Sequence, residues 1–221
     1  MNTEKTHVYF VPGLAAGKEI FKNINLPESR YAVHILEWML PEKAETLDNY
    51  ARRMAKMVTQ PNSVLVGVSF GGVMVQEMSR FLDLRKLIIV SSVKSRNELP
   101  LRLKLARKTG AYKLLPTGWA LSVKDLTKLA IGPRSKKRLN LYQEYLSVRD
   151  KSYLDWAIKQ MVCWDQELPL PEVIHIHGDK DIVFPLKNIQ NAQVLEGGTH
   201  VMILNKGSRI SKELELIIEN E

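Results

Sequence analysis

The sequence predicts an α/β protein, in which a mostly parallel sheet of about six strands is covered by helices on both faces. Short β-rich runs alternate with helical patterns in the first half of the chain, and the alternation returns near its end. A long helix-rich stretch separates these two parts. Strands that alternate with helices favour right-handed crossovers, which place successive strands parallel to one another.

The strands are predicted from short runs rich in β-branched and aromatic residues. The run SVLVGV at 63–68 is almost continuously apolar, which is typical of a parallel strand buried on both faces. The expected strands span 7–11, 31–36, 63–68, 86–90, 172–177 and 192–195.

Three helices are expected to pack against this sheet. Thr46 is a candidate N-cap for the first, whose apolar residues follow a period of 3.6. The second follows the strand at 63–68 directly and runs from about 70 to 82. The third ends the chain with an apolar face made of Ile210, Leu214, Ile217 and Ile218.

Strand patterns are absent from the stretch 94–168, which holds several helical segments. We interpret this stretch as a helical insertion over one edge of the sheet. The whole chain, 1–221, is then a single domain, as its length allows.

The composition is that of an ordinary globular protein, with 45% apolar and 25% charged residues. This excludes a disordered tail protein and a collagen-like chain. The net charge of +8 is unevenly placed. Between Arg85 and Arg138 there are 15 Lys and Arg residues against two acids, Glu98 and Asp125, whereas the remainder is mildly acidic. The basic charge therefore belongs to the middle of the chain.

A single cysteine, Cys163, excludes an internal disulfide and a cysteine-based metal cluster. The first ten residues lack the basic head and apolar stretch of a secretory signal. No apolar run approaches the ~18 residues that span a membrane. We therefore expect a cytoplasmic protein that is not integral to a membrane.

A G-x-S-x-G element, Gly67-Val68-Ser69-Phe70-Gly71, joins the predicted strand at 63–68 to the helix after it. A nucleophile on such a sharp turn needs unusual backbone angles, and flanking glycines such as Gly67 and Gly71 remove clashing Cβ atoms. Ser69 would then project beyond the carboxyl end of a central strand. The alternatives are an ordinary N-capping serine and a phosphate-binding turn.

A serine nucleophile requires a base and an orienting acid, and both have candidates downstream. Asp181 follows the strand at 172–177, and His200 follows the strand at 192–195. The carboxyl ends of parallel strands meet at one edge of the sheet, so these loops are expected to lie close to Ser69. Asp179 competes with Asp181 for the role of the acid.

The segments GVSFGG, HIHGDKDIVFP and GGTHVMI resemble, in order and spacing, the three catalytic motifs of the α/β-hydrolase family. The resemblance covers about 7–92 and 170–218 and implies an α/β-hydrolase fold without the family's usual first antiparallel strands. It implies that Ser69 is the nucleophile, that His200 is the general base and that Asp181 orients His200. Asp179 then caps the turn, and the stretch 94–168 corresponds to the family's variable lid.

The resemblance also implies an oxyanion hole made by the backbone N–H groups of Phe70 and Leu14. Where the family commonly has His-Gly, this chain has Pro12-Gly13, a change that leaves a backbone donor in place. From the residues alone, PGLAAG is equally well explained as a plain glycine turn.

The expected function is that of a serine hydrolase that cleaves a carboxylic ester or thioester of a small molecule through an acyl-enzyme on Ser69. The alternatives are an amidase or C–C hydrolase with the same triad, and a catalytically silent binding protein on the same scaffold. No organic cofactor or metal is implied. His175 and His177 share one face of a strand, but no third metal ligand stands at a suitable spacing, which favours a structural role.

The basic middle has two interpretations: a solvated surface of long cationic side chains, or a region that attracts an anionic substrate. For the second, the expected cluster is Lys104, Arg107, Lys108 and Lys113. Nucleic acid is a disfavoured partner, because few aromatic residues interleave these charges and no binding motif is present.

Overall fold

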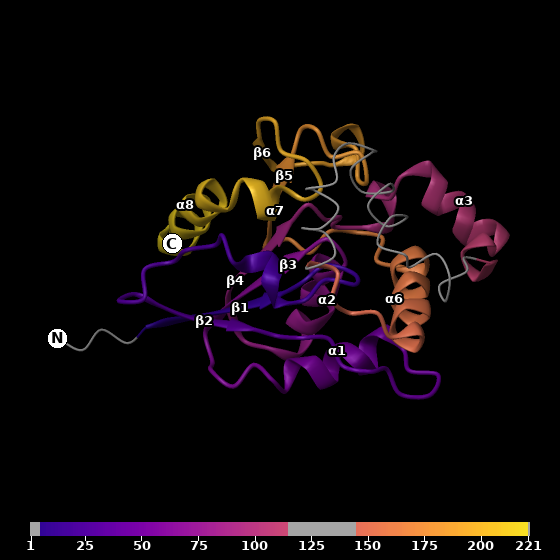
Figure 1. Ribbon diagram of the computed structural model, residues 1–221, viewed down its shortest axis with the longest axis horizontal. Helices are drawn as coiled ribbons and strands as arrows, with labels where there is room; N and C mark the ends of the chain where they lie inside the picture. Colours follow the sequence, from indigo (N-terminus) through magenta and orange to yellow (C-terminus); the bar gives the residue numbers. More distant parts are fainter. Residues whose placement is uncertain (1–4, 115–144, 221) are drawn as a thin grey trace.

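Parallel strands form the sheet of the protein in the order β2-β1-β3-β4-β5-β6. The structure is a computed structural model and describes residues 5–114 and 145–220 (Figure 1). The prediction of a six-stranded sheet is confirmed, and every pair of neighbouring strands is parallel. The strands are β1 Thr6–Val11, β2 Tyr31–Ile35, β3 Ser63–Val68, β4 Leu84–Val90, β5 Val173–Gly178 and β6 Gln193–Leu195.

Strand β3 lies at the centre of the sheet, and all six of its residues are buried. Its apolar run is explained by this position, because helices cover both faces of the sheet. Val66 is in register with Phe10 of β1 on one side and with Ile88 of β4 on the other. The carboxyl end of the most buried strand therefore lies between two neighbouring strand ends.

The helices divide between the two faces of the sheet (Figure 1). Residues of α1, α2 and α6 share one apolar cluster with the sheet, and residues of α7 and α8 share the other. As predicted, Thr46 caps α1, since its Oγ1 accepts a hydrogen bond of 3.2 Å from the Asn49 N–H. The helices are α1 Leu47–Ala55, α2 Phe70–Met78, α3 Leu101–Thr109, α6 Lys151–Cys163, α7 Met202–Asn205 and α8 Gly207–Glu219. Short 3₁₀ turns are η1 Lys18–Phe21, η2 Ser79–Phe81, η3 Arg96–Glu98, η4 Ala111–Leu114 and η5 Leu186–Asn188.

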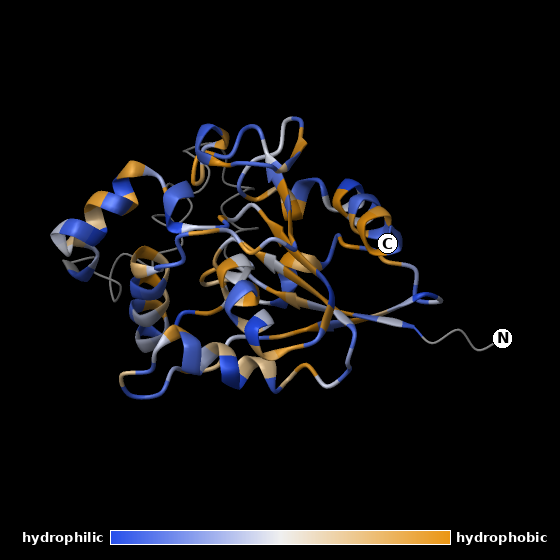
Figure 2. Ribbon diagram, turned by 180° about the vertical axis from the view of Figure 1, so that it is seen from behind, coloured by the Kyte–Doolittle hydropathy of each residue, from blue (hydrophilic) through white to orange (hydrophobic). Residues whose placement is uncertain are grey.

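The sheet separates two apolar layers, and alternate strand residues enter each of them. On β4, Leu87 and Ile89 belong to the layer of α1 and α2, whereas Ile88 and Val90 belong to the layer of α8. Figure 2 shows the resulting band of apolar strands in the middle of the molecule. Burial of this band from both sides is the main driving force for the fold.

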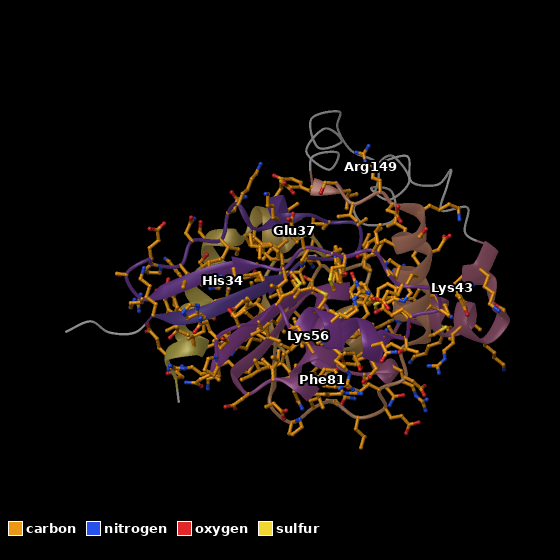
Figure 3. All side chains as sticks on the ribbon, turned by 90° about the horizontal axis from the view of Figure 1, so that it is seen from below. His34, Glu37, Lys43, Lys56, Phe81 and Arg149 are labelled. Carbon is orange, nitrogen blue, oxygen red and sulfur yellow. The ribbon has the colours of Figure 1, made fainter. Side chains whose placement is uncertain are left out.

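At the edge of the sheet formed by β2, His34 contacts two side chains of the neighbouring strand β1. Figure 3 shows His34 on this edge, away from Lys56, which follows the end of α1. The imidazole of His34 stacks on Tyr9 with ring centroids 4.4 Å apart, and its Nε2 lies 2.8 Å from Nδ1 of His7. These contacts join β1 to β2 through their side chains.

Helices α3 and α6 follow β4 and precede β5, within the stretch predicted to be a helical insertion. They pack against each other at one end of the sheet (Figure 1). Arg107 of α3 ties them together, since its guanidinium donates to the Trp164 carbonyl at 3.0 Å and to Asp165 at 2.5 Å. Part of the stretch, 115–144, lies outside the described residues, so the insertion 94–168 as a unit stays a prediction. Over the described ranges, none of the helices has both the length and the apolar character needed to cross a membrane.

Helix α8 offers a matched test of the packing. Leu214 is fully buried beneath the sheet, whereas Leu216, two residues further, is 58% exposed. Replacing Leu214 by Ala is expected to lower the free energy of unfolding by about 2–5 kcal/mol, because a cavity is left in the core. The same change at Leu216 should stay within about 0.5 kcal/mol of the wild type. Urea denaturation of both variants measures the difference, and equal losses would contradict the packing described here.

Candidate active site

Ser69 occupies the sharp turn between β3 and α2, with φ 54° and ψ −118°. This backbone conformation is strained for a residue with a side chain, and strain of this kind persists only where surrounding contacts enforce it. Two hydrogen bonds do so here. The Ser69 N–H donates to the Val90 carbonyl at 3.0 Å, and the Ser92 hydroxyl donates to the Ser69 carbonyl at 2.7 Å.

The glycines of the turn allow backbone segments to approach closely. A Cβ atom on Gly71 would overlap the carbonyl oxygens of Val11 and Pro12, at the end of β1. A Cβ atom on Gly67 would overlap the backbone of Gly71. Because these neighbours are backbone atoms, they cannot move aside as a flexible side chain would. The sequence prediction that both positions need glycine has this steric explanation.

Ser69, His200 and Asp181 come together at the carboxyl edge of the sheet. Nε2 of His200 lies 3.0 Å from the Ser69 Oγ, and Nδ1 of His200 lies 2.9 Å from Oδ2 of Asp181. Each residue stands in a loop after a parallel strand: β3, β6 and β5 respectively. The imidazole therefore bridges a hydroxyl and a carboxylate, which is the geometry that activates a serine hydroxyl.

Asp181 is buried and firmly held. Its Oδ1 accepts hydrogen bonds from the N–H groups of Val183 and Phe184, at 2.8 and 2.9 Å. Burial alone would raise the pKa of this carboxyl, but the hydrogen bond and charge of His200, followed by the hydrogen bond from the Phe184 N–H, outweigh it and lower the pKa. The side chain thus stays ionised. Asp179, the competing acid, makes no hydrogen bond to His200 and has one buried oxygen without a partner among the described residues.

Solved structures share the fold of this chain. An esterase from Exiguobacterium antarcticum superposes with a TM-score of 0.70 at 18% identity, over 98% of this chain and 93% of its own. A hydrolase from Pseudomonas aeruginosa PA01 gives 0.73 at 12% identity, over 99% and 91%. The chain has the α/β-hydrolase fold. A bromoperoxidase from Bacillus anthracis gives 0.67 at 15% identity, over 98% and 93%, so the fold is not restricted to esterases.

At these identities the likeness shows the fold, not the activity. No protein-family model and no curated protein matches the sequence. The sequence analysis expected this chain to lack the first antiparallel strands that are usual in the α/β-hydrolase family. In the part of the chain that the structure describes, β2 and β6 are the edges of the sheet.

Two further glycines bring the acid and base loops together. A Cβ atom on Gly178, at the end of β5, would overlap the carbonyl of Gly198, which lies two residues before His200. The Lys180 N–H also donates to the Gly198 carbonyl at 2.8 Å. The contact sets the distance between Asp181 and His200 through backbone atoms. The sequence analysis did not predict it.

His175 and His177 lie behind the acid loop and are both buried. Nε2 of His177 is 2.8 Å from the Phe184 carbonyl and must donate to it, so its Nδ1 accepts from Nε2 of His175 at 3.2 Å. Phe184 in turn packs its ring edge-on against His200, with centroids 5.3 Å apart. The described ranges hold no cluster of three potential metal ligands. These contacts favour the structural interpretation of the histidine pair.

The two predicted oxyanion donors flank Ser69. Phe70 is the first residue of α2, so its N–H has no acceptor within the helix. On the other side, a Cβ atom on Gly13 would lie 3.4 Å from the Ser69 Cβ, so the loop after β1 passes directly beside the nucleophile. The Leu14 N–H makes no hydrogen bond with any part of the protein that the structure describes. Both donors remain candidates for an oxyanion.

Trp38 and Ser92 are site residues that the sequence analysis missed. Nε1 of Trp38 donates to the Gly13 carbonyl at 3.0 Å, and Ser92 holds the Ser69 carbonyl. Their positions just past the carboxyl ends of β2 and β4 are the signal that could have found them, since sites form at this edge.

The four predicted cations lie on α3 and the turn after it. Two of them have protein partners, because Lys104 donates to the Asn97 carbonyl at 2.7 Å and Arg107 pairs with Asp165. Lys108 and Lys113 are exposed, and neither forms an ion pair within the described ranges. No contact places these four side chains against Ser69, so a role for them in substrate attraction is a proposal.

The histidine pair predicts a pH-dependent stability. Burial, followed by the nearby charges of His177 and Lys94, holds the pKa of His175 well below its usual 6.5. As the pH falls below 6.5, the unfolded chain therefore binds a proton at this position before the folded chain does, and stability decreases. His175→Gln removes this group, so the slope of unfolding free energy against pH should fall by about 1.4 kcal/mol per pH unit below pH 6.5. Urea denaturation between pH 5 and 8 tests this, and parallel curves for the two proteins would contradict it.

Proposed function

We propose that the protein is a serine hydrolase that cleaves a carboxylic ester or thioester through an acyl-enzyme on Ser69. The observation that carries the proposal is the continuous hydrogen-bonded series from the Ser69 hydroxyl through His200 to Asp181, at 3.0 and 2.9 Å. The α/β-hydrolase fold, shared with solved esterases and hydrolases, supports the same class of reaction.

In the proposed reaction, the Ser69 Oγ attacks the carbonyl carbon while Nε2 of His200 takes the hydroxyl proton. The ionised Asp181 stabilises the resulting imidazolium and keeps Nδ1 protonated. The backbone N–H groups of Phe70 and Leu14 donate to the oxygen that becomes negative in the tetrahedral intermediate.

The imidazolium then returns its proton to the alkoxide or thiolate that leaves, and the acyl group stays on Ser69. Water attacks the acyl-enzyme, with His200 again acting as base, and releases a carboxylic acid. Nothing in this sequence of steps requires a metal or an organic cofactor.

Amide and C–C bond hydrolysis use the same triad and are the nearest alternatives. The alternative from another functional class is a binding protein that has the same fold but no catalytic activity. Against it stands the complete hydrogen-bonded series of Ser69, His200 and Asp181, because a protein without turnover has no chemical need to keep these three side chains in contact.

A fluorophosphonate probe tests the nucleophile. The folded wild type should be labelled on Ser69, and the Ser69→Ala variant should not be labelled at all, because the attacking oxygen is missing. Asp181→Asn should slow p-nitrophenyl acetate hydrolysis by about 10²–10⁴-fold, since an amide does not hold the imidazole in its required tautomer. Asp179→Asn is the matched control and should retain most of the rate. A folded wild type that resists the probe, or Ser69→Ala protein that is labelled equally, would overturn the proposal.

We further propose that the basic middle favours an anionic acyl substrate. The support is the exposed pair Lys108 and Lys113, together with the excess of basic residues between Arg85 and Arg138. Opposite charges separated by more than about 10 Å attract less as salt is added.

A pair of esters of similar size tests the charge effect. For p-nitrophenyl hemisuccinate, which is anionic, KM should rise several-fold when ionic strength increases from about 0.05 to 0.5 M. For neutral p-nitrophenyl butyrate it should stay nearly constant. The double variant Lys108→Gln/Lys113→Gln should lose much of this salt dependence. Salt-insensitive kinetics with the anionic ester would rule out the attraction and leave a solvated surface.

A further inference from the structure

We infer that Trp38 is a positioning residue for the oxyanion hole, because its indole bonds the backbone of one donor loop and stacks on the side chain of the other donor residue. The inference rests on the hydrolase function proposed above. Trp38 stands in the loop after β2 and touches the loop after β1 as well as the first residue of α2. It does not contact the reacting atoms itself.

The first contact is the hydrogen bond from the indole Nε1 of Trp38 to the Gly13 carbonyl, at 3.0 Å. The same carbonyl also accepts from the Ala16 N–H at 3.0 Å, within its own loop, so Trp38 supplies the bond that links this loop to the loop after β2. This carbonyl and the Leu14 N–H belong to the same peptide unit. In a planar trans peptide the two groups point in opposite directions, so holding the carbonyl fixes the direction of the N–H. A hydrogen bond to the carbonyl also polarises the unit and makes its N–H a stronger donor.

The second contact is an aromatic stack. The rings of Trp38 and Phe70 lie 5.4 Å apart at an interplanar angle of 25°. Phe70 is almost fully buried, and its backbone N–H is the other proposed oxyanion donor. The stack restricts the first residue of α2, which carries this N–H. One indole thus holds the two donors relative to each other.

Trp38 is itself held by two neighbours. Its ring lies 5.4 Å from that of Tyr153, which belongs to α6, and 6.3 Å from that of Tyr50. The Tyr50 hydroxyl bonds both the N–H and the carbonyl of Met39, the residue after Trp38, at 2.9 and 2.8 Å. The indole is therefore fixed by the core on one side and by α6 on the other.

Trp156 provides a matched control within the same aromatic cluster. Its Nε1 donates to the Glu45 carbonyl at 2.8 Å, and its ring meets the edge of Phe70 at 6.1 Å. It does not bond to the loop after β1. Changing either tryptophan to phenylalanine removes one indole N–H and one bond of similar length. Only the change at Trp38 removes a bond to the Gly13 carbonyl, which then keeps the bond from the Ala16 N–H alone.

The test compares Trp38→Phe with Trp156→Phe using p-nitrophenyl acetate and a fluorophosphonate probe. For Trp38→Phe we expect kcat and the labelling rate to fall about 10-fold or more, because a misdirected donor stabilises the transition state poorly. KM should change less than about two-fold, since the oxyanion forms only after binding. Trp156→Phe should alter kcat and the labelling rate less than about three-fold, although both variants lower the melting temperature.

Two further measurements separate the possible failures. Incorporating benzothienylalanine at Trp38 replaces the N–H by sulfur and keeps the bicyclic shape, so a loss of kcat there cannot come from poor folding. The inference is overturned if wild type reacts with the probe on Ser69 but Trp38→Phe and the benzothienylalanine protein lose no more rate than Trp156→Phe. If wild type fails to react with the probe, the proposed function is wrong and the inference falls with it.

Discussion

The close contact between the turn after β3 and the end of β1 is the constraint on which the candidate site depends. Gly71 lies so near the carbonyls of Val11 and Pro12 that a Cβ atom has no room. The same approach places Gly13 beside Ser69, so the nucleophile and one oxyanion donor are brought together by a single backbone contact. The strain at Ser69 is maintained because hydrogen bonds and packing on every side resist its release.

A second close backbone contact brings together the loops that carry the acid and the base. Gly178 meets Gly198, and Asp181 then lies within hydrogen-bond distance of His200. Burying a carboxylate is costly unless hydrogen bonds and an opposite charge offset the lost hydration. The imidazole of His200 supplies most of that compensation and the Phe184 N–H adds to it, which is why the buried Asp181 keeps a lowered pKa.

The sequence predicts the sheet well because its physical cause is local. The central strand β3 is an apolar run because it is buried on both faces, whereas the edge strands β2 and β6 are partly exposed. All six β-rich runs of the sequence lie where β1 to β6 lie. The positions of Ser69, Asp181 and His200 follow from the same strands, since each stands just past a carboxyl end. Contacts between loops leave no periodic signal. The bonds from Trp38 to Gly13 and from Ser92 to Ser69 depend on how separate segments meet in the fold, so the sequence alone does not reveal them.

The effect of the basic middle is also hard to predict from the sequence. The number of cations can be read from the sequence, but the groups that pair with them cannot. Arg107 and Arg96 both bind Asp165, and Arg107 also bonds the end of α6, so these cations hold α3 and the segment before it against the chain that leads to β5. Exposed pairs of this kind contribute little stability but fix orientation. The charge that can act on a dissolved anion is therefore smaller than the sequence total. On α3 and the turn after it, Lys108 and Lys113 form no ion pair within the described ranges. Arg102 and Lys104 are also exposed and bond only neutral carbonyls, so their charge is not neutralised either.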